Sequence, residues 1–105
     1  MTELELLLQE YLLSSGALLN EQGEVLVRVG NFSPWAESLL GPIALLLWDG
    51  AVRPAMTGQG REFALLQKVA PGWALVFGQD RAQGTEHILF ARQVGQALQD
   101  RFGPA

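Results

Sequence analysis

The sequence predicts a single α+β domain in which helices pack on an antiparallel sheet. Segments with helical periodicity alternate with short apolar segments separated by tight turns, in the order helix, strand, strand, helix, strand, strand, strand, helix. Strands joined by tight turns form hairpins, and hairpins joined by helices build an antiparallel sheet with helices packed on it. The chain has 105 residues, which gives room for one hydrophobic core, so a single domain is expected over 1–105.

The first helix is predicted over residues 3–14. Thr2 and Glu5 have the spacing of a capping box, in which the two residues satisfy each other's backbone N–H groups. Apolar side chains then recur at helical spacing on one face: Leu4, Leu7, Leu8, Tyr11 and Leu12. Gly16 is expected to end the helix in a left-handed conformation.

A β-hairpin is predicted next, with strands at 17–19 and 24–29. The turn between them ends at Gly23, which supplies a positive φ at little steric cost. Valine recurs at every second position of the second strand: Val25, Val27 and Val29. This period of two, with β-branched residues on one face, is typical of a strand.

A second helix is predicted over residues 35–48, with Ser33 as its N-cap and Pro34 in its first position. Gly41-Pro42 is expected to kink or interrupt it, because a proline inside a helix removes one backbone hydrogen bond. The segment is almost uniformly apolar, and such a helix must be covered on two sides. The predicted sheet covers one side of this helix. We expect a second molecule to cover the other side, unless the whole segment belongs to the core.

Three strands are predicted in the second half of the chain. A short edge strand is expected at 55–58, and a hairpin at 63–69 and 73–77 is joined by the turn Pro71-Gly72. The segment 73–77 is continuously apolar, which predicts a central strand buried on both faces.

The last helix is predicted after a loop at 78–84, with Thr85 as its cap and Gly103-Pro104 as its end. Its expected buried stripe is Ile88, Ala91, Val94 or Gly95, Leu98 and Phe102.

The composition excludes several classes of protein. Only 17% of the residues are charged, against about 25% in an average domain, which favours exposed apolar surface and a partner site. The net charge of −4 provides no basic face for nucleic acid. The absence of cysteine excludes disulfides, thiol catalysis and thiolate zinc sites. The acidic start Met1–Glu5, and an apolar run over 39–48 of about half the ~20 residues of a membrane span, predict a cytoplasmic protein without membrane insertion.

Residues that carry chemistry are not grouped along the chain. Gly58-Gln59-Gly60 lacks the lysine and the following helix of a phosphate loop, and the serines lack the glycine-flanked turn of a nucleophile. His87 has no residue at helical spacing to orient it. Six acidic residues are scattered singly and are expected to be solvated: Glu21, Glu24, Asp49, Glu62, Asp80 and Asp100. We therefore expect no catalytic residue, no metal, no cofactor and no enzymatic activity.

Two runs of the chain resemble the roadblock (dynein light chain) family. ALLNEQGEVLVRVG over 17–30 is similar to its opening hairpin, and GREFALLQKVAPGWALVFGQD over 60–80 is similar to its last. The element order agrees as well, so the resemblance covers nearly the whole chain. It implies a profilin-like three-layer sandwich, with a central antiparallel five-stranded sheet, one long helix on one face and the two terminal helices on the other.

The same resemblance implies a homodimer formed through the second helix and the strand after it. Members of the family are non-catalytic scaffolds and regulators of small Ras-like GTPases. Some members accelerate GTP hydrolysis by the GTPase that they bind. Gly41-Pro42 and the weak strand at 55–58 depart from the family pattern at this expected dimer seam. The residues expected at the dimer or partner interface are Trp35, Leu39, Leu40, Ile43, Leu46, Leu47, Trp48 and Met56.

Two other functions remain open on the sequence. One is a small-molecule sensor with an apolar pocket between sheet and helix. Its expected lining is Trp35, Trp48, Phe63, Trp73 and Phe77. The other is a purely structural subunit of an assembly.

Overall fold

The structure is a computed structural model that describes residues 2–46, 52–57, 60–79 and 85–103, with the side chains of 45, 52–57 and 85–87 left out of that description. Its elements are α1 (Glu3–Glu10), β1 (Ser15–Leu19), β2 (Val25–Gly30), α2 (Pro34–Leu39), the 3₁₀ helix η1 (Pro42–Leu46), β3 (Val52–Thr57), β4 (Gly60–Val69), β5 (Gly72–Gln79) and α3 (Thr85–Phe102).

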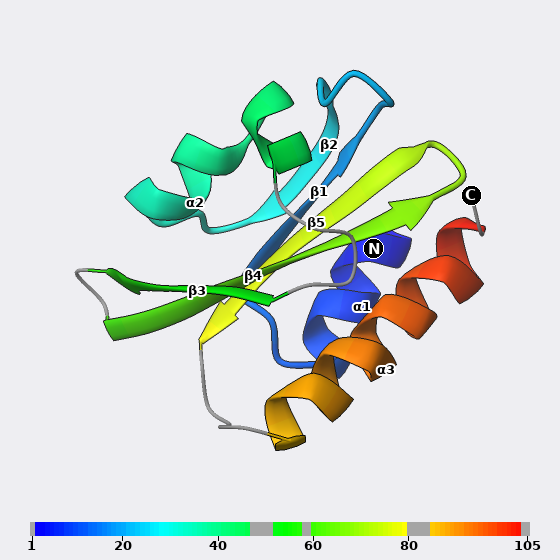
Figure 1. Cartoon of the computed structure of the whole chain (residues 1–105). Coiled ribbons are helices and arrows are strands. Elements are labelled where there is room, and N and C mark those ends of the chain that lie inside the picture. The colour runs from blue at the N-terminus through cyan, green and yellow to red at the C-terminus, as the bar shows by residue number, and fades with distance from the viewer. Residues whose placement is uncertain (1, 47–51, 58–59, 80–84, 104–105) are drawn as a thin grey trace.

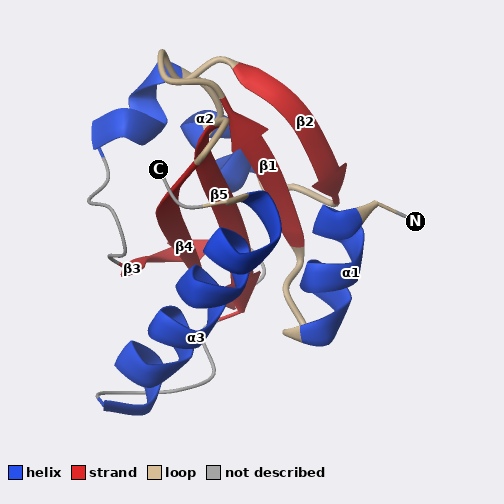
Figure 2. Cartoon of the chain, turned by 90° about the vertical axis from the view of Figure 1, so that its right-hand side faces the viewer, coloured by secondary structure: helices blue, strands red, loops and turns tan. Residues whose placement is uncertain are grey.

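One antiparallel sheet forms the middle of the molecule, with the strand order β2-β1-β5-β4-β3. Helices α1 and α3 pack on one face of this sheet, and α2 with η1 packs on the other (Figures 1 and 2). The predicted α+β class with an antiparallel sheet is confirmed.

The sheet separates two hydrophobic clusters, because successive side chains of a strand point to opposite faces. Strand β5 shows this directly: Ala74 and Val76 contribute to the cluster under α1 and α3, whereas Leu75 and Phe77 contribute to the cluster under α2. All four side chains are fully buried, as predicted for a central strand. The remaining buried members of the α1–α3 cluster are Leu4, Leu7, Leu8, Leu65, Val69, Ala91, Val94 and Leu98.

Helix α1 begins as predicted but ends at Glu10, four residues early. The capping box is present, with the backbone N–H of Glu5 donating to Thr2 Oγ1 at 3.2 Å. The left-handed residue at the end is Leu12, with φ 56°, and the backbone N–H of Leu13 donates to the carbonyl of Leu8 at 2.8 Å. The prediction for Gly16 is wrong, because Gly16 lies inside β1.

The second helix is interrupted where the sequence predicts. Helix α2 ends at Leu39, Gly41 adopts a φ of 116°, and η1 starts at Pro42 as a 3₁₀ helix. A proline in the first position of a helix loses no internal hydrogen bond, so the chain restarts there instead of continuing the α-helix. The predicted extension through Leu47 and Trp48 lies outside the described residues.

The later strands are longer than predicted. Strand β3 covers 52–57, β4 begins at Gly60, and β5 continues through Gly78 to Gln79. Pairing of Thr57 with Gly60 and of Glu62 with Gln79 carries the ladder beyond the apolar runs that marked the strands in the sequence. Residue 58 and the predicted loop at 80–84 lie outside the described residues.

One predicted buried position, Ile88, is wrong, and two of the alternating valines of β2 are exposed. Val25 and Val27 are each 39% exposed, because β2 is at the end of the strand order and has a neighbouring strand on one side only within the described sheet. Ile88 is 55% exposed, and Figure 1 shows the first turns of α3 extending beyond the strands.

Candidate interaction surface on α2 and η1

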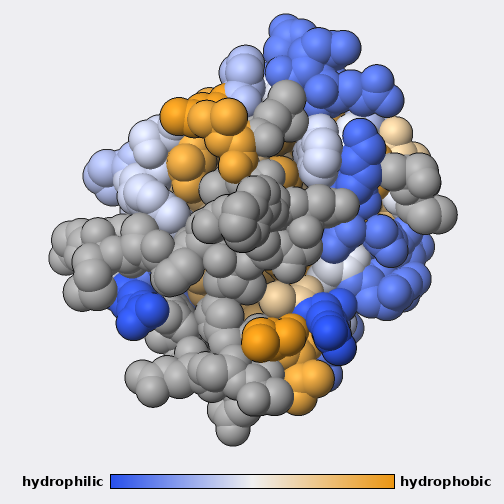
Figure 3. Space-filling view, in the orientation of Figure 1, coloured by the Kyte–Doolittle hydropathy of each residue, from blue (hydrophilic) through white to orange (hydrophobic). Residues whose placement is uncertain are grey.

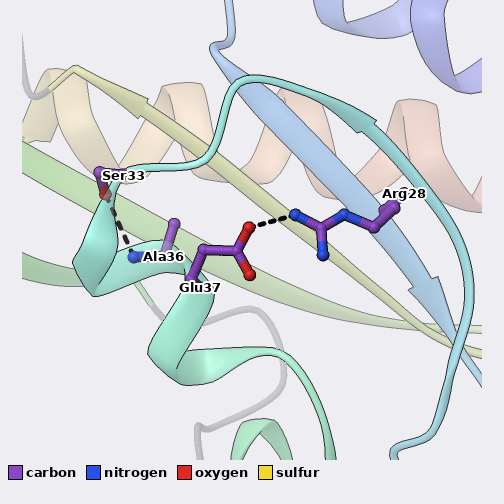
Figure 4. A network of polar contacts seen from close by, with 4 residues as sticks. All are labelled: Arg28, Ser33, Ala36 and Glu37. Atoms are coloured by element: carbon purple, nitrogen blue, oxygen red, sulfur yellow. Dashed lines mark hydrogen bonds and ion pairs between the residues drawn. The ribbon is translucent and has the colours of Figure 1, made fainter.

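Local hydrogen bonds start the α2–η1 segment, which here means residues 34–46. Ser33 Oγ accepts the backbone N–H of Ala36 at 3.1 Å (Figure 4), and the Ser33 carbonyl accepts that of Glu37 at 2.9 Å. Pro34 occupies the first helical position, where its missing N–H costs no hydrogen bond. The sequence therefore fixes where α2 begins, at the end of the loop that follows β2.

The inner side of the α2–η1 segment packs on the sheet. The Trp35 ring meets the Phe77 ring edge to face, with centroids 5.9 Å apart, and Phe32 meets Phe77 in the same way at 5.8 Å. Ala36 and Ala44 are fully buried. These contacts hold both halves of the interrupted helix against the sheet.

The outer side of the segment presents leucine and isoleucine to solvent. Ile43 is 48% exposed and Leu46 is 76% exposed, and they are three residues apart on η1. A 3₁₀ helix has three residues per turn, so these two side chains stand on the same side of it. We call this pair the η1 ridge. Figure 3 shows hydrophobic surface over the α2–η1 region.

The structure divides the eight residues predicted at the interface. Trp35, Leu39 and Leu40 are partly buried and pack against the cluster under α2, whereas the η1 ridge faces outward. Leu47 and Trp48 lie outside the described residues. Met56 lies in the edge strand β3, opposite Arg61, and its side chain is outside the description.

An ion pair that the sequence does not predict lies beside the α2–η1 segment. Arg28 of β2 pairs with Glu37 of α2 (Figure 4). The Arg28 guanidinium also lies 4.6 Å from the centroid of the Phe32 ring. The partners are nine residues apart and in different elements, so no local spacing indicates the contact. Both side chains are about half exposed, at 50% and 47%.

The aromatic residues expected to line a sensor pocket do not share one face. Phe77 lies opposite Ala64 and belongs to the cluster under α2, whereas Phe63 lies opposite Gly78 and packs edge to face on Phe90 of α3 at 5.9 Å. The sheet therefore separates Phe63 from Phe77 and Trp73, and this predicted lining is wrong. Trp48 lies outside the described residues.

A shallow groove does occur at another place, between the end of α1 and α3. Its volume is about 460 Å³. The residues that line it are Tyr11, Arg92, Gln93, Gln96, Ala97 and Asp100.

One acidic residue departs from the expected solvated surface. Glu62 is only 2% exposed, and its Oε1 accepts no hydrogen bond from the described residues. It lies in β4 between Ala55 of β3 and Gln79 of β5, where strands on both sides remove it from solvent. Glu21, Glu24 and Asp100 are exposed as predicted, and Asp49 and Asp80 lie outside the described residues.

Among the described residues, no three histidine, cysteine or acidic side chains come close enough together to hold a metal ion. The side chain of His87 falls outside that part of the chain. In the same residues, none of the helices combines the length and the apolar character needed to cross a membrane.

Comparison with known proteins adds no relative. The sequence matches no protein-family model, and no curated protein matches it significantly. The η1 ridge is therefore the feature on which we base a function.

Proposed function

We propose that the protein is a non-catalytic homodimeric regulator or scaffold that binds a small Ras-like GTPase. The observation that carries this proposal is the η1 ridge, in which Ile43 and Leu46 stand side by side in solvent beside a segment already packed on its own sheet. Complete burial of an isoleucine or leucine side chain, relative to full exposure, stabilises a contact by roughly 1.5–3 kcal/mol. Contact between two ridges buries four such side chains, which favours a homodimer.

The arrangement of the layers supports the profilin-like part of the proposal. The terminal helices α1 and α3 share one face of the sheet, and the second helix lies on the other. This is the arrangement that the resemblance to the roadblock family implies. The GTPase partner is proposed from that resemblance, carried by the hairpins at 17–30 and 60–80.

The proposed dimer seam combines the η1 ridge with β3, the edge strand that follows it. Strand β3 ends the strand order opposite to β2, so its outer side has no partner strand within the described sheet. The interruption at Gly41-Pro42 makes the helical part of the seam short, which gives Ile43 and Leu46 a large share of the contact.

The oligomeric state tests the homodimer. We expect a sedimentation mass of two protomers at tens of micromolar for the unmodified protein, and of one protomer for the double variant Ile43→Glu/Leu46→Glu. Leu89→Glu is the matched control, because Leu89 is also exposed, at 51%, but lies on α3. A single-protomer mass for the unmodified protein contradicts the homodimer.

Affinity capture tests the partner. The immobilised protein is incubated with lysate of its source organism in the presence of GDP or of a non-hydrolysable GTP analogue. We expect a small GTPase to be retained preferentially in one nucleotide state, and less of it by the Ile43→Glu/Leu46→Glu variant. If no GTPase is retained in either state, the proposed partner is wrong.

A further inference from the structure

Two buried polar atoms of the sheet have no hydrogen-bond partner among the described residues. They are the hydroxyl oxygen Oγ of Ser15 in β1 and the carboxylate oxygen Oε1 of Glu62 in β4. Ser15 is 1% exposed and Glu62 is 2% exposed. Removing a hydroxyl or a carboxylate from water without a new partner is unfavourable, so such groups are normally paired. Both groups therefore oppose the burial of the face on which they lie.

The strand register places Ser15 and Glu62 on the face that carries α2. Ser15 lies directly opposite Phe77, which belongs to the cluster under α2. Glu62 lies two positions before Ala64, which is opposite Phe77 and belongs to the same cluster. Every second residue of a strand points to the same face, so Glu62 points to this face as well. The two polar groups thus lie on either side of Phe77.

Helix α2 is a short segment that depends on its contacts with this face. It has six residues, and a helix of that length has little stability of its own. On its inner side, Ala36 is fully buried and the Trp35 ring packs edge to face on Phe77. On its outer side, Glu37 pairs with Arg28 (Figure 4), and exposed ion pairs of this kind contribute little. The apolar contacts of α2 are therefore opposed directly by the two polar groups.

The chain can bend at the end of α2 without moving η1. Gly41 has a φ of 116°, and a Cβ built on it would meet no atom within 4 Å, so the backbone has free space there. Hinges are a few residues of this kind that absorb a change of backbone angles. Beyond Gly41, η1 remains fixed on the sheet through Ala44, which is fully buried.

We propose that α2 is a lid that opens from the sheet about Gly41, and that Ser15 and Glu62 set how often it opens. In the closed state both polar groups are buried without partners, whereas in the open state water hydrates them. The closed state is therefore less favourable than its apolar contacts alone would make it. Opening exposes Phe77 between a hydroxyl and a carboxylate. The η1 ridge keeps its place, so the lid does not depend on the homodimer proposed above.

Cysteine labelling measures the opening. The chain has no cysteine, so an introduced one is the only thiol. Ala36→Cys places it under the lid, and Ala74→Cys places it in the central strand β5 on the opposite face, under α1 and α3. Without denaturant, we expect a thiol reagent to label Ala36→Cys at least about tenfold faster than Ala74→Cys. Equal rates would show that α2 leaves the sheet only when the whole protein unfolds, and would overturn the proposal.

Substitution of the two polar groups tests their role in the Ala36→Cys background. Glu62→Gln keeps the shape of the side chain but removes its charge, so we expect the closed state to gain and labelling to slow about tenfold. Ser15→Ala is expected to slow it by about threefold. Glu21→Gln is the matched control, because it removes the same charge from an exposed turn residue. An unchanged rate for Glu62→Gln, or equal slowing by Glu21→Gln, overturns the role of Glu62.

Urea gives a second, independent measurement. The effect of urea on an opening reaction scales with the surface that the opening exposes. Release of the six-residue α2 exposes little surface, so labelling of Ala36→Cys should rise only weakly with urea at low concentrations, whereas labelling of Ala74→Cys should rise steeply. This comparison also detects a substitution at Ala36 that merely destabilises the whole protein, because the dependence on urea would then be equally steep at both positions. Such an outcome overturns the lid.

Discussion

Gly23, in the turn between β1 and β2, lies directly against Pro42 at the start of η1. A Cβ built on Gly23 would come 2.7 Å from the Cα of Pro42 and 3.1 Å from the carbonyl oxygen of Gly41. Gly23 has a φ of 87°, and its N–H donates to the carbonyl of Asn20 at 3.0 Å. The break in the second helix therefore packs against the β1–β2 turn. The position of η1 depends on Gly23, about twenty positions earlier in the chain.

We expect Gly23→Ala to destabilise the protein by about 1–3 kcal/mol, because the substitution adds both backbone strain at a positive φ and a contact too short to relax easily. Urea unfolding measures this change. Gly41→Ala is the matched control, since Gly41 also has a positive φ but a Cβ on it would meet no atom within 4 Å. An equal loss for both variants would show that the contact with Pro42 contributes nothing.

A second prediction concerns Leu12, the residue that ends α1 in a left-handed conformation. The N–H groups of Leu12 and Leu13 donate to the carbonyls of Gln9 and Leu8 at 3.3 and 2.8 Å, the pattern of a Schellman motif. Glycine is the residue that this position favours, and the side chain of Leu12 is 64% exposed. We expect Leu12→Gly to raise the free energy of unfolding by about 0.5–1 kcal/mol, measured in urea. A decrease would show that the leucine side chain stabilises the end of the helix.

The starts of helices could be predicted from the sequence because their interactions are local. The capping box at Thr2 and Glu5, and the cap at Ser33, each involve residues three positions apart. The end of α1 was harder, because the chain enters the left-handed region at a leucine instead of at a glycine. The strand order is not local either, and so the exposure of β2 could not be read from its alternating valines.

The candidate site was predicted as a set of residues but not as a geometry. The apolar run after Trp35 indicated a surface, and the structure separates that run into an inner side and the η1 ridge. The separation follows from the change of helix type at Pro42, which places Ile43 in line with Leu46. The burial of Glu62 and the pairing of Arg28 with Glu37 depend on strands and helices brought together by the fold, which local sequence does not encode.

A third prediction concerns Phe77, which is fully buried and meets Phe32 and Trp35 edge to face. Phe77→Leu removes both ring contacts and leaves a small void, so we expect a loss of about 1–3 kcal/mol. Because Trp35 loses its neighbour, the near-ultraviolet circular dichroism of the folded protein should change as well. Phe90→Leu is the control on the other face, where among the described residues the ring meets Tyr11 and Phe63. An equal spectral change in both variants would contradict the assignment.

The last prediction concerns the ion pair between Arg28 and Glu37. Both side chains are about half exposed, so water and salt screen their attraction, and exposed pairs typically contribute about 0.2–1 kcal/mol. We expect a coupling energy in this range from a double-mutant cycle of Arg28→Ala and Glu37→Ala, measured by urea unfolding. It should fall further in 1 M salt, where charges are screened within about 3 Å. Part of the effect of Arg28→Ala should persist in salt and without Glu37, because the guanidinium also lies over the Phe32 ring. A coupling energy well above 1 kcal/mol would contradict the expectation that solvent screens the attraction between Arg28 and Glu37.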